Sequence, residues 1–158
     1  MQSDGRALIR IMSVPDHATV AATILGSMGK NGINIEVLVE SFDLEGHGNL
    51  SLIIDQKDLD NALGALEEVK PTIDAKALSY VPDVAVITLF GPHLREKPLV
   101  HAMMFSSMAG VGISSLAIST SISSVSCVVE GQYLNTATHA LTEAFDAPFQ
   151  VKERPKDY

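Results

Sequence analysis

The sequence predicts an α+β fold in which one β-α-β-β-α-β unit occurs twice. The first observation is an internal repeat, because the residues from Val20 to Ile33 recur from Val100 to Ile113 at a constant offset of 80. A repeat of this length indicates a duplicated supersecondary unit. The second observation is that strand-like and helix-like hydrophobic periods alternate along each copy. The third is size: in a chain of 158 residues, each half has too few residues to form an ample core of its own.

The first copy opens with a strand, a helix and a hairpin. Aliphatic residues predict a strand over 7–14, and helical spacing predicts a helix over 18–31. Gly32 is suited to the left-handed conformation that ends many helices. Alternating apolar and polar residues predict a strand over 33–40, and a glycine-containing loop connects it to another strand over 50–54.

The rest of the first copy follows the same logic. Asp58 is placed to cap a second helix, which we expect to stop at Pro71. A weakly patterned strand over 73–78 completes the first copy. The resulting order is that of ferredoxin-like folds, with antiparallel sheets and helices on one face. We expect the second copy to place strands and helices over residues 84–90, 98–108, 115–120, 125–129, 133–147 and 149–153.

Composition excludes several classes of function. The net charge is −8, and the 11 lysines and arginines are scattered, so we expect no nucleic-acid partner. No stretch approaches the length of a membrane span, and the first residues lack the apolar segment of a signal peptide. The single cysteine excludes a disulfide framework. These features predict a cytoplasmic protein.

Nothing in the sequence has the spacing that catalysis needs. The five histidines share no metal-ligand spacing, and Cys127 falls in a predicted buried strand where a thiol is unreactive. Asp55, Asp58 and Asp60 flank a helix start, where carboxylates favour the helix dipole. We therefore expect no catalytic residue, no metal site, no cofactor and no enzymatic activity in this chain.

Several motifs, in their order and spacing, resemble those of a known family. Val14-Pro15-Asp16 and Gly32-Ile33-Asn34-Ile35 resemble the first ACT module of aspartate kinase regulatory regions, and Asp58 to Leu63 resembles its D-L-x-x-A-L helix. Ile118-Ser119-Thr120-Ser121 and Ala140 to Phe145 resemble the second module. The resemblance covers residues 7–150.

This resemblance implies two tandem ACT modules, over residues 7–80 and 81–153. The first strand, near Ala7 to Met12, either pairs within its own module or crosses into the other. Such modules bind a small amino acid, usually threonine or lysine, and form dimers. We therefore expect an allosteric amino-acid sensor, a homodimer, with a catalytic kinase subunit as its candidate partner.

The resemblance and simple chemistry together predict a binding site. A helix start offers unpaired N–H groups and partial positive charge to the carboxylate of an amino acid, and Asp16 is placed to pair with the ammonium. Asn34 offers both a donor and an acceptor. The predicted binding residues are Asp16, His17, Ala18, Thr19, Gly32, Ile33, Asn34, Ile35 and Glu40, completed across the module seam by Ser114, Ser119, Thr120 and Ser121.

Departures from the family pattern leave an alternative open. Thr19 stands where the family has glycine, Ser114 where it has asparagine and Ile122 where it has glutamate. Asp16 is also an ordinary helix cap, and the serines are ordinary strand and turn residues. We expect one better-formed site centred on the first module. The alternative is an assembly module of the same fold that binds nothing small.

Overall fold

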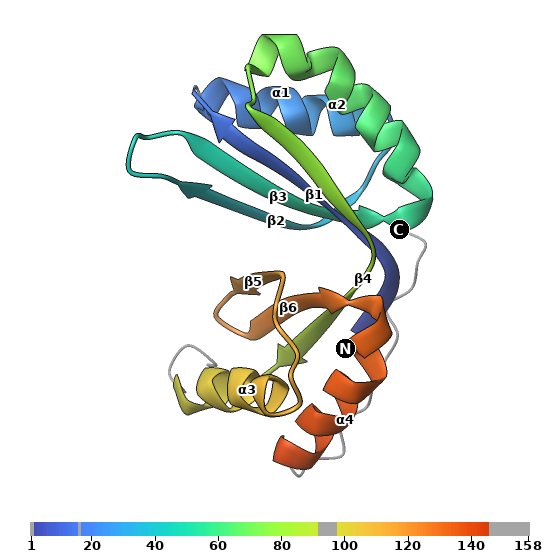
Figure 1. The fold of residues 1–158 in the computed structure, drawn as a ribbon, viewed down its shortest axis with the longest axis vertical. Helices are drawn as coiled ribbons and strands as arrows, with labels where there is room; N and C mark the ends of the chain where they lie inside the picture. The colour runs from blue at the N-terminus through green and yellow to red at the C-terminus, as the bar shows by residue number, and fades with distance from the viewer. Residues whose placement is uncertain (1, 16, 92–97, 146–158) are drawn as a thin grey trace. The chain divides into compact units, whose positions relative to one another are not determined.

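The computed structural model describes residues 2–15, 17–91 and 98–145 of the chain (Figure 1). These residues form two compact units. The first unit consists of residues 6–82, and the second unit combines residues 2–5 with the described residues from 83 onward. The observed division falls between residues 82 and 83, while the module bounds 7–80 and 81–153 remain a prediction.

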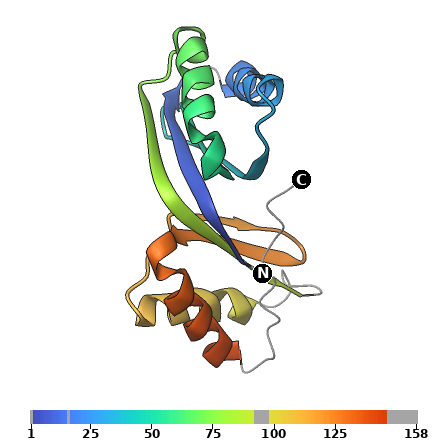
Figure 2. The same ribbon diagram turned by 90° about the vertical axis from the view of Figure 1, so that its right-hand side faces the viewer.

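The first unit has the ferredoxin-like order expected from the sequence. Its elements are β1 (Gln2–Val14), α1 (His17–Lys30), β2 (Ile35–Phe42), β3 (Gly48–Asp55), the 3-10 turn η1 (Gln56–Asp58), α2 (Leu59–Ile73) and β4 (Ala77–Phe90). β3 pairs antiparallel with β1 on one side and with β2 on the other. Helices α1 and α2 lie on one face of these strands (Figure 1, Figure 2).

The core of the first unit lies between that face and the two helices. Alternate residues of β1, including Ile9 and Ile11, are fully buried against Ile24 and Met28 of α1 and Leu66 of α2. The period of two in the strand and of 3.6 in the helices brings these apolar side chains to one layer. Their burial provides the main driving force for folding of this unit.

The second unit repeats the arrangement. It contains the later part of β4, then α3 (Pro98–Gly110), β5 (Ala117–Thr120), β6 (Ser124–Glu130), the 3-10 turn η3 (Gly131–Tyr133) and α4 (Leu134–Phe145). β6 pairs antiparallel with both β4 and β5. The core includes Ile87, Met104, Met108, Cys127 and Leu141. The predicted strand over 149–153 lies outside the described residues.

The hydrogen-bonded order of the strands is β2-β3-β1-β4-β6-β5. The expected α+β fold of two ferredoxin-like units is thereby confirmed. Residues Ala7 to Ile11 of β1 pair with β3 of their own unit. The residues before Arg6 belong to the other unit, so β1 serves both.

The duplication is visible in burial and in backbone conformation. Residues 31–40 and 111–120 have the same order of exposed, intermediate and buried positions, with Ile33 and Ile113 as the buried ones. Gly32 and Gly112 both adopt left-handed φ angles, +67° and +75°. The amide of the next residue then bonds to the carbonyl of Met28 or Met108, five residues back, at 2.9 and 3.0 Å. The predicted glycine cap of α1 is confirmed and occurs twice.

Two local predictions were wrong, and a third was confirmed only in position. Helix α2 continues through Pro71 to Ile73 and ends at Asp74, a left-handed cap whose N–H bonds to the carbonyl of Lys70. The proline removes the bond that its own N–H would have donated to the carbonyl of Glu67, and the helix ends two residues later at Ile73. The expected strand over 73–78 therefore begins only at Ala77. Asp58 occupies the N-cap position of α2 as expected, but its side chain makes no cap bond. Asp55 caps η1 instead, because its side chain accepts from Lys57 N–H at 3.0 Å.

Candidate functional site

The start of α1 presents one group of predicted binding residues. The helix begins at His17, and the side chains of Ala18 and Thr19 are exposed in its first turn. The backbone N–H groups of a first helical turn have no partner within the helix and carry partial positive charge. This end of the helix is therefore suited to a carboxylate. Asp16 lies outside the described residues.

A second group lies at the other end of the same helix. Gly32 provides the turn, Ile33 is buried in the core and Asn34 is exposed. Ile35 begins β2, where it pairs with Ile54 and packs on the core. Since the side chains of Ile33 and Ile35 are used in packing, Asn34 is the side chain of this group that is free to meet a ligand.

The two groups do not come together within one unit. α1 has 14 residues, so its ends are about 21 Å apart at 1.5 Å per residue. Glu40, which is exposed, belongs with the helix start: it pairs with Leu50, and Leu50 pairs with Ile11 near the end of β1. One end of the unit thus carries Ala18, Thr19 and Glu40, and the other carries Asn34.

The predicted residues of the second unit form a tight hairpin. Ser119 pairs with Ser126 and Thr120 with Val125, while Ser114 is exposed before the strand. Ser121 N–H donates to the carbonyl of Ser124 at 2.8 Å, and the two hydroxyl oxygens are also 2.8 Å apart. These bonds hold the β5–β6 turn, and a ligand role for this group remains a prediction.

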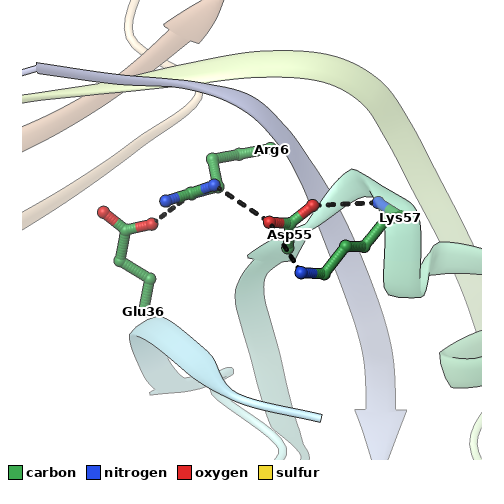
Figure 3. Close-up of polar contacts among 4 residues, drawn as sticks. All are labelled: Arg6, Glu36, Asp55 and Lys57. Carbon is green, nitrogen blue, oxygen red and sulfur yellow. Dashed lines mark hydrogen bonds and ion pairs between the residues drawn. The ribbon is translucent and has the colours of Figure 1, made fainter. Parts of the chain in front are cut away.

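Sequence reasoning missed a buried ionic cluster (Figure 3). Arg6 is 1% exposed, and its Nε lies 2.5 Å from Oε2 of Glu36. Its Nη1 lies 3.4 Å from Oδ2 of Asp55, which in turn is 4.0 Å from Nζ of Lys57. The cluster ties β1 to β2 and β3. The only sequence signal was a charged residue directly before an aliphatic strand, and its partners lie 30 and 49 residues away.

In the second unit, two of the three positions that match Arg6, Glu36 and Asp55 are apolar. Arg6 pairs with Asp55 in the β1–β3 ladder, and Val84 pairs with Glu130 in the β4–β6 ladder. Leu116 stands where the offset of 80 places the counterpart of Glu36. Val84 is fully buried. Val84 and Leu116 thus stand where the first unit has the Arg6–Glu36 pair, while Glu130 keeps a carboxylate at the position of Asp55.

Asp43 and Cys127 have shifted pKa values. The backbone N–H of His47 holds the pKa of the Asp43 carboxyl below its ordinary value of 3.8, with smaller help from the His47 ring and the Glu45 N–H. Burial raises the pKa of the Cys127 thiol to about 12, so the thiolate that reacts and binds metals is not formed near neutral pH.

Within residues 2–15, 17–91 and 98–145, no group of three or more histidine, cysteine, aspartate or glutamate side chains is arranged to hold a metal ion. None of the helices there is long and apolar enough to cross a membrane.

Comparison with known proteins identifies the class. Residues 87–145 match the ACT domain family. The aspartokinase of Pseudomonas aeruginosa is 31% identical over 149 residues, which cover 93% of this chain and 36% of that protein. The aspartokinase of Bacillus sp. strain MGA3 is 29% identical over 138 residues, covering 87% of this chain and 34% of that protein. The chain thus spans about a third of the length of the curated relatives it matches.

Solved structures match over nearly their full length. The ligand-free regulatory subunit of aspartate kinase from Thermus thermophilus superposes with a TM-score of 0.83 at 25% identity, covering 92% of this chain and 95% of that chain. A chain in the structure of aspartokinase alpha and beta subunits gives 0.82 at 28% identity, covering 90% and 94%.

The chain is therefore a pair of ferredoxin-like units, and the second of them matches the ACT domain family over residues 87–145. It resembles the regulatory region of aspartate kinase, as its motifs indicated, and corresponds to the regulatory part of that enzyme rather than to its catalytic domain.

Proposed function

We propose that the chain is the amino-acid-sensing regulatory module of an aspartate kinase, with threonine or lysine as its effector and a catalytic kinase part as its partner. The observation that carries the proposal is a difference in coverage. The chain matches 95% of the regulatory subunit of aspartate kinase from Thermus thermophilus but only about a third of the whole aspartokinases. A cytoplasmic location remains a prediction from the sequence.

The chemistry of the first unit supports an amino-acid ligand. The exposed start of α1 is suited to the carboxylate because its N–H groups and dipole favour negative charge. Asn34 and Glu40 are exposed and provide oxygen acceptors for an ammonium group. The helix start thus suits the negative carboxylate of an amino acid, and the side-chain oxygens suit its positive ammonium group.

The separation of the two groups makes a second copy of the chain part of the proposal. An amino acid cannot span the roughly 21 Å length of α1, so one ligand contacts both groups only if two copies contribute one group each. β2 is an end strand of the sheet order, and it exposes Leu38 and Phe42 by 41% and 56%. A strand that is paired on one side only and carries large apolar side chains is suited to association with another copy.

Regulation then follows from linkage. An effector that binds one dimer arrangement more tightly than another shifts the population toward the first. If the catalytic part is less active in that arrangement, the effector inhibits it, with a coupling free energy of about 1–3 kcal/mol in typical cases. The sensor needs no catalytic group of its own for this effect.

Titration calorimetry with L-threonine and L-lysine tests the sensing function. We expect one of them to bind, and to raise the melting temperature, because a ligand of the native state stabilises it. Ala18→Asp should abolish binding, since a carboxylate in the first turn suits the helix dipole but repels the ligand carboxylate. Ala22→Asp, an exposed position one turn further along α1, is the matched control and should bind normally.

Mixing two defective variants tests the shared site. Ala18→Asp and Asn34→Ala chains should each fail to bind alone. Refolded together, mixed dimers contain one intact pairing, so we expect about a quarter of the wild-type binding capacity to return. No recovery would refute a site shared between copies. If wild-type chains bind neither amino acid at millimolar concentration, the sensing function is wrong and the assembly alternative is favoured.

A further inference from the structure

Strand β1 contains a strained bulge just before the turn to α1. Ile11 pairs with Leu50 and Val14 with Gly48, so Met12 and Ser13 together oppose the single residue Asn49. Ser13 has a φ of +57°, in the left-handed region that non-glycine residues avoid. Such backbone outliers persist only when surrounding contacts hold them, and they gather at functional sites.

Two contacts hold this bulge from opposite sides. The backbone N–H of Ser13 donates to Oδ1 of Asn49 at 2.9 Å, in place of a ladder bond that the extra residue disrupts. The carbonyl of Met12 accepts from the N–H of Lys76 at 3.1 Å. Asn49 is the side-chain part of this arrangement, and it reaches over from β3.

The described residues of the second unit show no matching bulge where β4 pairs with β6. There Leu89 pairs with Val125 and Phe90 alone opposes Ser124, with no shift of register. The next residue, Gly91, continues the ladder by donating to the carbonyl of Ser123 at 3.0 Å. The extra residue and its asparagine are therefore specific to the unit in which we place the better-formed site.

We propose that Asn49 is a positioning residue for effector binding, which rests on the function proposed above. It holds Ser13 in the left-handed conformation and thereby fixes the direction in which the chain runs to the start of α1, four residues later. Asn49 does not touch the ligand. It pre-organises the N–H groups that do, so less ordering is needed on binding.

Three variants separate this role from a general structural one. Asn49→Ala removes the acceptor, and we expect it to weaken binding of L-threonine or L-lysine about tenfold through lost pre-organisation. Asn49→Asp keeps an oxygen acceptor and should bind within about threefold of wild type. Adding Ser13→Gly to Asn49→Ala should recover part of the loss, because glycine adopts positive φ without strain. Asn135→Ala, at an exposed position on α4, is the matched control.

Two readouts keep the outcomes distinct. If Asn49→Ala lowers the melting temperature but leaves the amino-acid affinity unchanged, Asn49 is merely structural and the proposal is wrong. If wild-type chains bind no amino acid, the sensing function fails on its own. Amide exchange then decides whether Asn49 holds the turn: we expect the Ser13 amide to lose at least about tenfold protection in Asn49→Ala, with shifted resonances at Ala18 and Thr19. An unchanged Ser13 amide would overturn the tether itself.

Discussion

The energetic cost of burying Arg6 depends on its ionic partners. Its guanidinium is buried, and so is the Glu36 carboxylate beside it, whose side chain is 5% exposed. Burying a charge is costly unless the partner stays in place, whereas replacing both partners by apolar groups is often neutral. The second unit shows that aliphatic residues also fit these positions.

Truncating Arg6 alone should therefore lower the free energy of unfolding more than replacing both Arg6 and Glu36. We expect Arg6→Ala to lower the free energy of unfolding by about 3 kcal/mol, because Glu36 then loses its buried guanidinium partner. The double variant Arg6→Val with Glu36→Leu, which copies Val84 and Leu116, should lose less. Urea denaturation measures both. Lys70→Ala, which breaks an exposed pair with Glu67, should cost no more than about 0.5 kcal/mol.

The Asp43 carboxyl makes the stability of the protein depend on pH only in the acid range. Its folded-state pKa lies below the ordinary value of 3.8, so its contribution is present above that value and is lost as pH falls through the lowered pKa. We expect the amides of Glu45 and His47, which donate to Asp43 at 3.0 and 2.8 Å, to keep their NMR shifts from pH 7 to 5. They should move only below about pH 4. Movement centred above about pH 5 would show that a group other than Asp43 causes the effect.

At the scale of elements, the glycine caps after α1 and α3 are the clearest shared feature. Gly32 and Gly112 have positive φ, and a Cβ added at either would meet no atom within 4 Å. The cost of Gly32→Ala or Gly112→Ala is then conformational alone, and we expect about 1 kcal/mol for each in thermal unfolding.

Gly64→Ala is the matched control, and we expect it to change the stability in the opposite direction. It lies inside α2, where an added Cβ also meets no atom within 4 Å and no positive φ is required. Gly64→Ala should stabilise the chain by about 0.5–1 kcal/mol, because alanine has the higher helix propensity. If all three substitutions destabilised equally, backbone conformation would not be the cause.

The caps also show what the sequence can predict. A glycine cap depends only on a few neighbouring residues. The same holds for the hydrophobic period that predicted α1 and β2. The ionic cluster is different, because Arg6 meets partners 30 and 49 residues away. The extra residue at Ser13 likewise depends on the register against β3. The site residues were predicted as one group, but the length of α1 separates them within a unit, and no periodicity shows that.

For the whole molecule, the end strand β2 is the surface on which we expect dimers to form. Phe42→Glu should raise the dimer dissociation constant at least about tenfold, because it places a charge among apolar contacts. Analytical ultracentrifugation measures the change. Leu44→Glu is the control, since Leu44 is fully exposed in the hairpin loop after β2 and should leave the dimer intact. Equal effects of both variants would indicate a general loss of solubility or folding rather than a defined interface.

The division of β1 between the two units has a consequence for the order of folding. The first unit is continuous in sequence, from residue 6 to 82, while the second joins residues 2–5 to residues from 83 onward. A ribosome therefore completes the first unit before it has made most of the second. The second must close a loop of nearly 80 residues to recruit its share of β1, and that closure is cheap only when the intervening chain is already folded. The first unit must therefore fold before the second unit can be completed. A variant that slows folding of the first unit should delay folding of both units.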